Sequence, residues 1–89
     1  MIERTVRIVN RLGLHARAAA KLVALASRFS SEIQISKGDK RVSGKSIMGV
    51  MMLAAAQGSQ VTLHAEGNDA AEALDALQAL IADKFGEGA

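Results

Sequence analysis

His15 is the residue with the clearest capacity for chemistry. It follows a loop that contains glycine, Leu12 to Leu14, and it directly precedes Ala16, where a helical pattern begins. The first turn of a helix leaves backbone N–H groups unpaired and carries a partial positive charge. Arg17 lies in the same turn. An imidazole, free amides and a guanidinium would therefore converge on one point, which suits a dianionic phosphoryl group.

The same position should keep the His15 ring neutral, because a helix N-terminus disfavours a positive charge. A neutral imidazole is a nucleophile, whereas an imidazolium is not. A second interpretation is that His15 only starts the helix, which is the ordinary role of a histidine at such a place. The position by itself leaves both interpretations open.

Ser46 and His64 are the other residues whose chemistry could matter. Ser46 precedes a short apolar segment, IMGVMMLA, and serine is a preferred N-cap, so we expect it to start a helix. His64 lies in an alternating segment, QVTLHAE, on the face that points away from the core. We expect it to be exposed to solvent and uninvolved. The chain has no cysteine and only two histidines, so we expect no metal site and no cofactor.

Composition argues against several classes of function. The two phenylalanines are the only aromatic residues, so we expect no base-stacking platform and no nucleic-acid partner. The longest uncharged apolar run, residues 47–56, covers about half of a membrane span. The N-terminus contains Glu3, Arg4 and Arg7 and lacks the apolar region of a signal peptide. We therefore expect a soluble, cytoplasmic protein without membrane insertion.

The net charge of +2 conceals an uneven distribution. Residues 1–45 hold ten of the eleven lysines and arginines and three of the nine acids, a net charge of +7, whereas residues 46–89 have a net charge of −5. One interpretation is a basic surface that attracts acidic partners or phosphate, to which Lys21, Arg28 and Lys45 would belong. The other interpretation is that solvated charges simply cluster.

Hydrophobic periodicity predicts four strands and three helices in one domain, residues 1–89. We expect strands at residues 2–9, 32–36, 40–43 and 60–66, and helices at residues 16–29, 47–54 and 70–85. The last helix should begin with a capping pair, Asp69 and Glu72, and stop at Gly86. The apolar positions expected to face the core are Val6, Ile8, Ala19, Leu22, Val23, Ala26, Phe29, Ile33, Ile35, Val61, Leu63, Ala65, Leu74, Leu77, Ile81 and Phe85.

The element order βαββαβα predicts an α+β fold. Strand–helix–strand connections are right-handed, and the last strand can enter the sheet beside the first one as a split βαβ unit. The expected architecture is an open-faced β-sandwich, in which three helices cover one face of a four-stranded antiparallel sheet.

Two motifs resemble one family closely. The run Gly13-Leu14-His15-Ala16-Arg17 and a second run, KSIMGVM at residues 45–51, resemble the HPr family. These proteins are the histidine phosphocarriers of the bacterial phosphoenolpyruvate-dependent phosphotransferase system. The resemblance covers essentially the whole chain, including its length and element order. The HPr-like fold is the open-faced sandwich that periodicity predicts.

The resemblance implies a phosphoryl-group carrier rather than an enzyme. His15 would accept a phosphoryl group at Nδ1 from phosphorylated enzyme I and pass it to EIIA-type domains, in sugar transport or in regulation. Ala16 and Arg17 would bind the phosphate, and Ser46 would be a regulatory site for an HPr kinase/phosphorylase. The protein would act as a monomer, and its partners would dock at the site and on the second helix. The docking residues of that helix would be Ile47, Met48 and Met51.

Two positions depart from the family's pattern. Most relatives have proline where this chain has Ala18, and little should be lost because alanine also forms helix well. Relatives often have asparagine or serine, which can contact the histidine ring, where this chain has Leu12. Backbone groups alone would then orient the His15 ring, which leaves its tautomer open.

Two other functions compete with the carrier. A non-catalytic regulator would act through Ser46 and the second helix, but the retained His15 and Arg17 argue against that as the sole role. A nucleic-acid-binding domain would explain the basic half, but no aromatic residues accompany the basic ones. Within the family, the sequence leaves open whether the acceptor belongs to sugar uptake or to a nitrogen-related regulatory branch.

Overall fold

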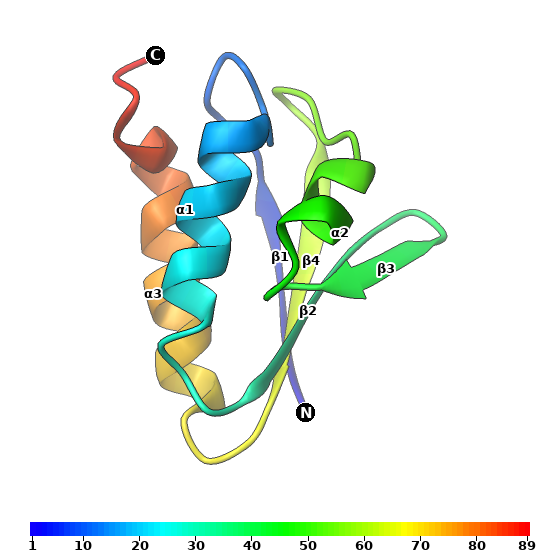
Figure 1. Ribbon diagram of the computed structural model, residues 1–89, viewed down its shortest axis with the longest axis vertical. Helices are drawn as coiled ribbons and strands as arrows, with labels where there is room; N and C mark the ends of the chain where they lie inside the picture. Colours follow the sequence, from blue (N-terminus) through cyan, green and yellow to red (C-terminus); the bar gives the residue numbers. More distant parts are fainter.

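The computed structural model describes residues 1–89, and its strands and helices follow one another in the order βαββαβα (Figure 1). The helices lie together on one side of the sheet, and the other side of the sheet is open. In chain order the elements are β1 (Ile2–Arg7), α1 (Ala16–Ala26), β2 (Glu32–Lys37), β3 (Lys40–Ser43), α2 (Ile47–Met52), β4 (Gln60–Glu66), α3 (Ala70–Ala82) and the 3-10 turn η1 (Lys84–Gly86).

The sheet has the strand order β1-β4-β2-β3, and every neighbouring pair is antiparallel. The last strand in sequence, β4, therefore lies between β1 and β2, as the split βαβ arrangement predicts. β3 is an edge strand, and its charged residues Lys40 and Arg41 are exposed. The predicted α+β open-faced sandwich is confirmed. No helix has the length and continuous apolar sequence that crossing a bilayer requires.

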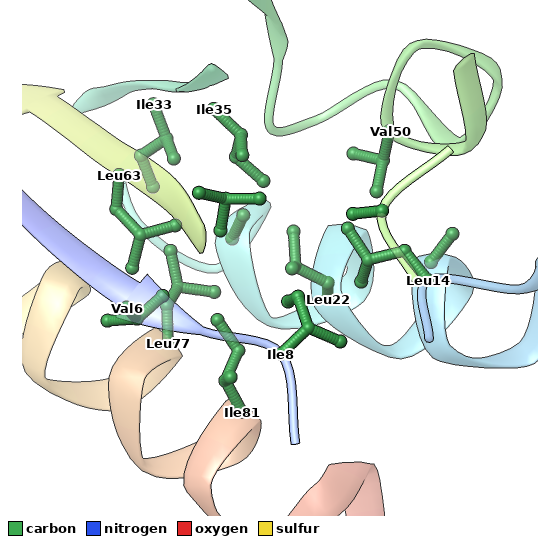
Figure 2. Close-up of a cluster of buried hydrophobic side chains, with 14 of the residues drawn as sticks. Val6, Ile8, Leu14, Leu22, Ile33, Ile35, Val50, Leu63, Leu77 and Ile81 are labelled. Carbon is green, nitrogen blue, oxygen red and sulfur yellow. The ribbon is translucent and has the colours of Figure 1, made fainter. Parts of the chain in front are cut away.

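The core lies between the sheet and the helices. Alternation along β4 directs Val61, Leu63 and Ala65 towards the helices, and all three are buried. Leu22 of α1 and Leu77 of α3 are also buried, and Figure 2 shows side chains from both helices meeting those of the sheet. Of the apolar positions expected to face the core, only Val23 and Phe29 are partly buried. This packing fixes α1, and with it the histidine that precedes the helix.

All three helices end earlier than periodicity predicts, α2 at Met52 rather than at residue 54. α1 stops at Ala26, and residues 27–29 continue in tight turns that carry Phe29 against the core. α3 stops at Ala82, because Lys84 and Phe85 take positive φ values of 57° and 55° and the chain turns back. Phe85 is fully buried, as predicted, but it reaches the core from this reversal rather than from a helix.

The predicted capping pair at the start of α3 is wrong. Asp69 makes no side-chain bond to its own helix. Its carboxylate instead accepts the backbone N–H groups of Ser30 and Ser31, each at 2.9 Å, and the hydroxyl groups of the same two serines. These bonds, the Ser31 hydroxyl first and the Ser30 amide next, lower the pKa of Asp69 from 3.8 to about 2. Asp69 therefore joins the start of α3 to the loop that follows α1.

The prediction that His64 is exposed is also wrong, because the side chain is only 8% exposed. Its Nε2 lies 2.8 Å from the Ser36 hydroxyl, and its Nδ1 lies 3.3 Å from the Glu3 carboxylate. His64 does point to the face of the sheet opposite the core. β4 is an interior strand, however, so side chains from β1 and β2 cover that face around the ring.

Candidate functional site

His15 is the N-cap residue of α1. Its backbone is extended, with φ −75° and ψ 178°, and its carbonyl accepts the amide of Ala19 at 2.8 Å. The amides of Ala16, Arg17 and Ala18 donate to no acceptor in the protein. Three free N–H groups therefore stand at the helix terminus beside the ring, which is the anion-binding arrangement that the sequence predicts.

The loop before His15 is fixed to the segment that follows α2. The amide of Leu14 donates to the carbonyl of Ala55 at 2.9 Å, and Leu14 is buried. Gly13 has a φ of +67°, and a Cβ there would overlap the Ala55 carbonyl and lie 2.9 Å from Ala56 Cα. Only glycine suits this conformation and this close approach. The contacts of Gly13 and Leu14 with Ala55 therefore fix the position of His15 and keep the end of α2 close to the site.

Arg17 is exposed and makes no hydrogen bond or ion pair, so its guanidinium is free to bind an anion. His15 and Arg17 line one open pocket of about 690 Å³. Arg11, which sequence reasoning did not single out, lines it too and is also exposed. The predicted convergence of a histidine, helix amides and an arginine is therefore present, with a second arginine beside it.

The C-terminal segment closes the other side of the pocket. A carboxylate oxygen of Glu87 bonds to Nε2 of His15, and the other oxygen accepts Nδ2 of Asn10 at 3.0 Å. Asn10 is fully buried and also donates to the Gly13 carbonyl at 2.8 Å. The expectation that backbone groups alone orient the ring is wrong, because a side chain 72 residues away holds it. No local sequence pattern marks this contact, since it depends on the reversal at Lys84 and Phe85.

The hydrogen bonds on Glu87 favour its charged form. The pKa of its carboxyl lies below the usual 4.5, chiefly because Asn10 donates to it and next because His15 does. Lys21 adds a further favourable charge, and its Nζ donates to the Phe85 carbonyl at 2.6 Å, which ties the C-terminal segment to α1. The histidine thus has a carboxylate on one side and free amides on the other.

α2 presents an apolar surface near the site. Ser46 caps the helix, as predicted, since its Oγ accepts the Gly49 amide at 3.0 Å. Val50 and Leu53 are buried and hold the helix to the core. The remaining large apolar residues are exposed: Ile47 at 44%, Met48 at 73%, Met51 at 41% and Met52 at 65%. Met52 was not among the predicted docking residues.

Of the three residues expected to form a basic surface, Lys21 and Lys45 donate hydrogen bonds to backbone carbonyls of the protein. Lys45 donates to the Phe29 carbonyl at 2.8 Å, and Lys21 holds Phe85 as described above. Arg28 is exposed and makes no bond. The positive charge that remains without a partner near His15 therefore comes from Arg11 and Arg17.

Comparisons with known proteins agree with the fold and show the family to which the chain belongs. A family model described as "PTS HPr component phosphorylation site" matches residues 2–83. A phosphocarrier protein HPr of Cupriavidus necator is 58% identical over 88 residues, 99% of each chain. A phosphocarrier protein NPr of Shewanella violacea is 51% identical over 97% of this chain and 94% of its own.

A solved structure points the same way. The crystal structure of HPr from Thermoanaerobacter tengcongensis superposes with a TM-score of 0.94 at 54% identity, and the match covers 98% of each chain. Fold, sequence identity over the full length and the family model lead to one conclusion: this chain belongs to the HPr family, the phosphocarriers of the bacterial phosphoenolpyruvate-dependent phosphotransferase system.

Proposed function

We propose that His15 accepts a phosphoryl group from phosphorylated enzyme I and passes it to an EIIA-type acceptor. The observation that carries the proposal is the free anion site around the ring. The amides of Ala16, Arg17 and Ala18 and the guanidinium of Arg17 have no partner in the protein, and they surround the one histidine that reaches an open pocket. His64, in contrast, is buried in the sheet.

The transfer is a displacement at phosphorus. The lone pair of His15 Nδ1 forms the new N–P bond while the bond from phosphorus to the donor breaks, and the electron pair of that bond leaves with the donor. Nδ1 is available because it makes no hydrogen bond, whereas Nε2 is engaged by Glu87. Arg17 and the helix amides stabilise the charge on the phosphoryl oxygens, as positioned donors do in phosphoryl transfer generally.

The exposed apolar surface of α2 is the proposed docking site for both partners. It consists of the predicted residues Ile47, Met48 and Met51, to which the structure adds Met52. Methionine suits a surface that binds more than one partner, because its side chain is flexible and polarisable. The carrier acts as a monomer in the cytoplasm, and it is a group carrier rather than a catalyst that turns over a substrate alone.

A relay assay tests the proposal. The chain is incubated with phosphoenolpyruvate and enzyme I, freed from both, and then mixed with either a sugar-specific EIIA or a nitrogen-branch EIIA. We expect the chain to become labelled and to lose its label to one acceptor, and the preferred acceptor identifies the branch. Absence of labelling with active enzyme I would contradict the carrier role.

A second candidate function is regulation through Ser46, and the position of this residue supports it. Ser46 is partly exposed and caps the helix whose next two residues, Ile47 and Met48, are exposed. A phosphoryl group placed there by an HPr kinase/phosphorylase would border the docking surface. The two functions are compatible. A labelled His15 supports the carrier, whereas a chain that is labelled only at Ser46 supports the regulator.

A further inference from the structure

The contact between Glu87 and His15 has a chemical consequence for the ring. An ionised carboxylate only accepts hydrogen bonds, so the imidazole nitrogen that faces it must carry the proton. Glu87 faces Nε2. In the neutral ring the proton is therefore on Nε2, and the lone pair is on Nδ1. The nitrogen with the lone pair is the one that makes no hydrogen bond and is left to react.

We infer that Glu87 and Asn10 are positioning residues that hold the His15 proton on Nε2 and keep Nδ1 free for phosphorus. The inference rests on the proposed function and extends it. Glu87 touches the ring, and Asn10 sets Glu87 by donating to its second oxygen at 3.0 Å while anchoring the loop through the Gly13 carbonyl. Burial of Asn10 fixes the direction of both of its donor hydrogens.

This arrangement lets the transfer run without moving a proton. When Nδ1 forms its bond to phosphorus, the ring becomes an imidazolium that keeps its proton on Nε2, next to the Glu87 carboxylate. When the phosphoryl group leaves, the N–P bond breaks, its electrons return to Nδ1, and the ring is neutral again with the same proton in place. In the Ser-His-Asp triads of hydrolases, the aspartate likewise orients the histidine and stabilises its charged form.

The C-terminal segment supplies the rigidity that such a contact needs. Phe85 is fully buried, and its carbonyl is held by Lys21 at 2.6 Å. Near the end of the segment the amide of Arg11 donates to the Ala89 carbonyl at 3.1 Å. Glu87 therefore lies between two attachments to the body of the protein, and its side chain is only 12% exposed. A carboxylate on a free tail would not hold a ring in this way.

The spectroscopic test follows the proton itself. In protein labelled with ¹⁵N histidine, we expect the wild type near neutral pH to show a downfield proton on His15 Nε2, protected from exchange by Glu87. E87A should lose this signal to exchange with water, while E87D, which keeps both acceptor oxygens of the carboxylate, should retain part of it. E72A is the matched control, because Glu72 is exposed and makes no hydrogen bond. A wild-type ring that is protonated on Nδ1 instead would overturn the inference.

The kinetic test separates positioning from docking. Loss of the carboxylate partner of a metal-binding histidine typically costs about 10- to 100-fold. By analogy, we expect E87A to slow transfer from phosphorylated enzyme I about tenfold or more. The KM for enzyme I should change less than the rate, because Glu87 is not one of the exposed apolar residues of α2, and E87D, which keeps both acceptor oxygens, should recover part of the rate. Transfer by E87A at the wild-type rate would overturn the inference and leave the carrier role intact.

Asn10 is tested through its effect on Glu87. In N10A the pKa of the Glu87 carboxyl should rise towards its usual 4.5, because the largest cause of its lowering is removed. A ¹³C titration of the carboxyl measures this pKa, and the dispersion of the amide spectrum shows that N10A is folded. An unchanged titration in folded N10A would remove Asn10 from the inference. A wild type that takes no label from enzyme I, in contrast, would contradict the proposed function itself.

Discussion

At the scale of single residues, the two histidines differ in what surrounds them rather than in their chemistry. His15 stands at a helix terminus with free amides and an open pocket, whereas His64 lies beneath neighbouring side chains in the sheet. Nucleophilic reactivity needs access as well as a lone pair. The proposal that His15 is the reactive histidine therefore rests on the surroundings of the ring and not on the residue type.

Arg17→Ala should slow phosphoryl transfer without unfolding the protein. Arg17 is exposed and has no partner, so its loss should change stability by no more than about 0.5 kcal/mol. A hydrogen bond to a charged group contributes about 1.5–3 kcal/mol, which corresponds to a rate loss of about 10- to 100-fold. Stopped-flow transfer from phosphorylated enzyme I and thermal unfolding measure the two effects.

Arg28→Ala is the control for this prediction. Arg28 is exposed on the turn after α1, and its side chain makes no hydrogen bond or ion pair. The substitution therefore removes the same charge at a position that does not line the His15 pocket. Equal slowing by both variants would show that general charge, rather than the position of Arg17, drives the transfer.

At the scale of elements, Asp69 is the joint between two parts of the chain that are distant in sequence. Asp69 precedes the first residue of α3, and its carboxylate accepts hydrogen bonds from Ser30 and Ser31 in the loop that joins α1 to β2. The folded pKa is about 2, below the ordinary 3.8. The contribution of this group to stability is therefore complete above about pH 4 and is lost as the pH falls towards 2.

Asp69→Asn should flatten the pH dependence of stability in that acidic range. The variant should be less stable than the wild type at neutral pH, because an amide offers one acceptor oxygen where the carboxylate offers two. Thermal unfolding at a series of pH values measures both effects. Asp83→Asn, which removes an exposed acid without a side-chain bond, is the control. If the stability of the wild type and that of the Asp69→Asn variant depended on pH in the same way, the proposed contribution of the ionised Asp69 carboxylate to stability would be contradicted.

Ser46→Asp should keep the fold and weaken docking of enzyme I. Aspartate is a good N-cap and its charge suits a helix N-terminus, so α2 should not melt. The same charge borders the exposed Ile47 and Met48, where it should repel an acidic partner and slow association. Transfer rates from phosphorylated enzyme I at two salt concentrations measure this, and added salt should narrow the difference from the wild type.

Ala71→Asp is the matched control for that variant. It adds an acid to the first turn of α3, which Figure 1 places at the other end of the molecule from the start of α1. Its transfer rate should equal that of the wild type. Earlier unfolding of Ser46→Asp by several degrees would show that Ser46 is chiefly a cap and that the electrostatic account is wrong.

The same elements show how far the sequence predicts the fold and the site. Alternation predicted the bounds of β4 and its core-facing residues, because Val61, Leu63 and Ala65 follow a period of two. It did not predict the burial of His64, which depends on the neighbouring strands β1 and β2. The N-caps His15 and Ser46 were predicted because their signals are local. The end of α3, the contacts of Asp69 and the Glu87–His15 bond were not, since each depends on where a distant segment lies in three dimensions.

At the scale of the whole molecule, the last segment of the chain links the core to the site. Phe85 is fully buried although it follows the end of α3, and the residues after it reach back to His15. Phe85→Ala should lower the free energy of unfolding by about 3–5 kcal/mol, because it leaves a cavity. Chemical denaturation measures the loss. Phe29→Ala, which removes a partly buried phenylalanine, should cost less; equal costs would contradict the anchoring role of Phe85.

The central claim is that His15 alone carries the phosphoryl group, and mapping the label tests it most directly. Wild type, His15→Ala and His64→Ala proteins are incubated with phosphoenolpyruvate and enzyme I, and the phosphorylated residue is located by mass spectrometry under alkaline conditions. The account predicts one acid-labile phosphoryl group on His15 in the wild type and in folded His64→Ala, and none in His15→Ala. Uptake by His15→Ala, or a label on His64, would contradict it.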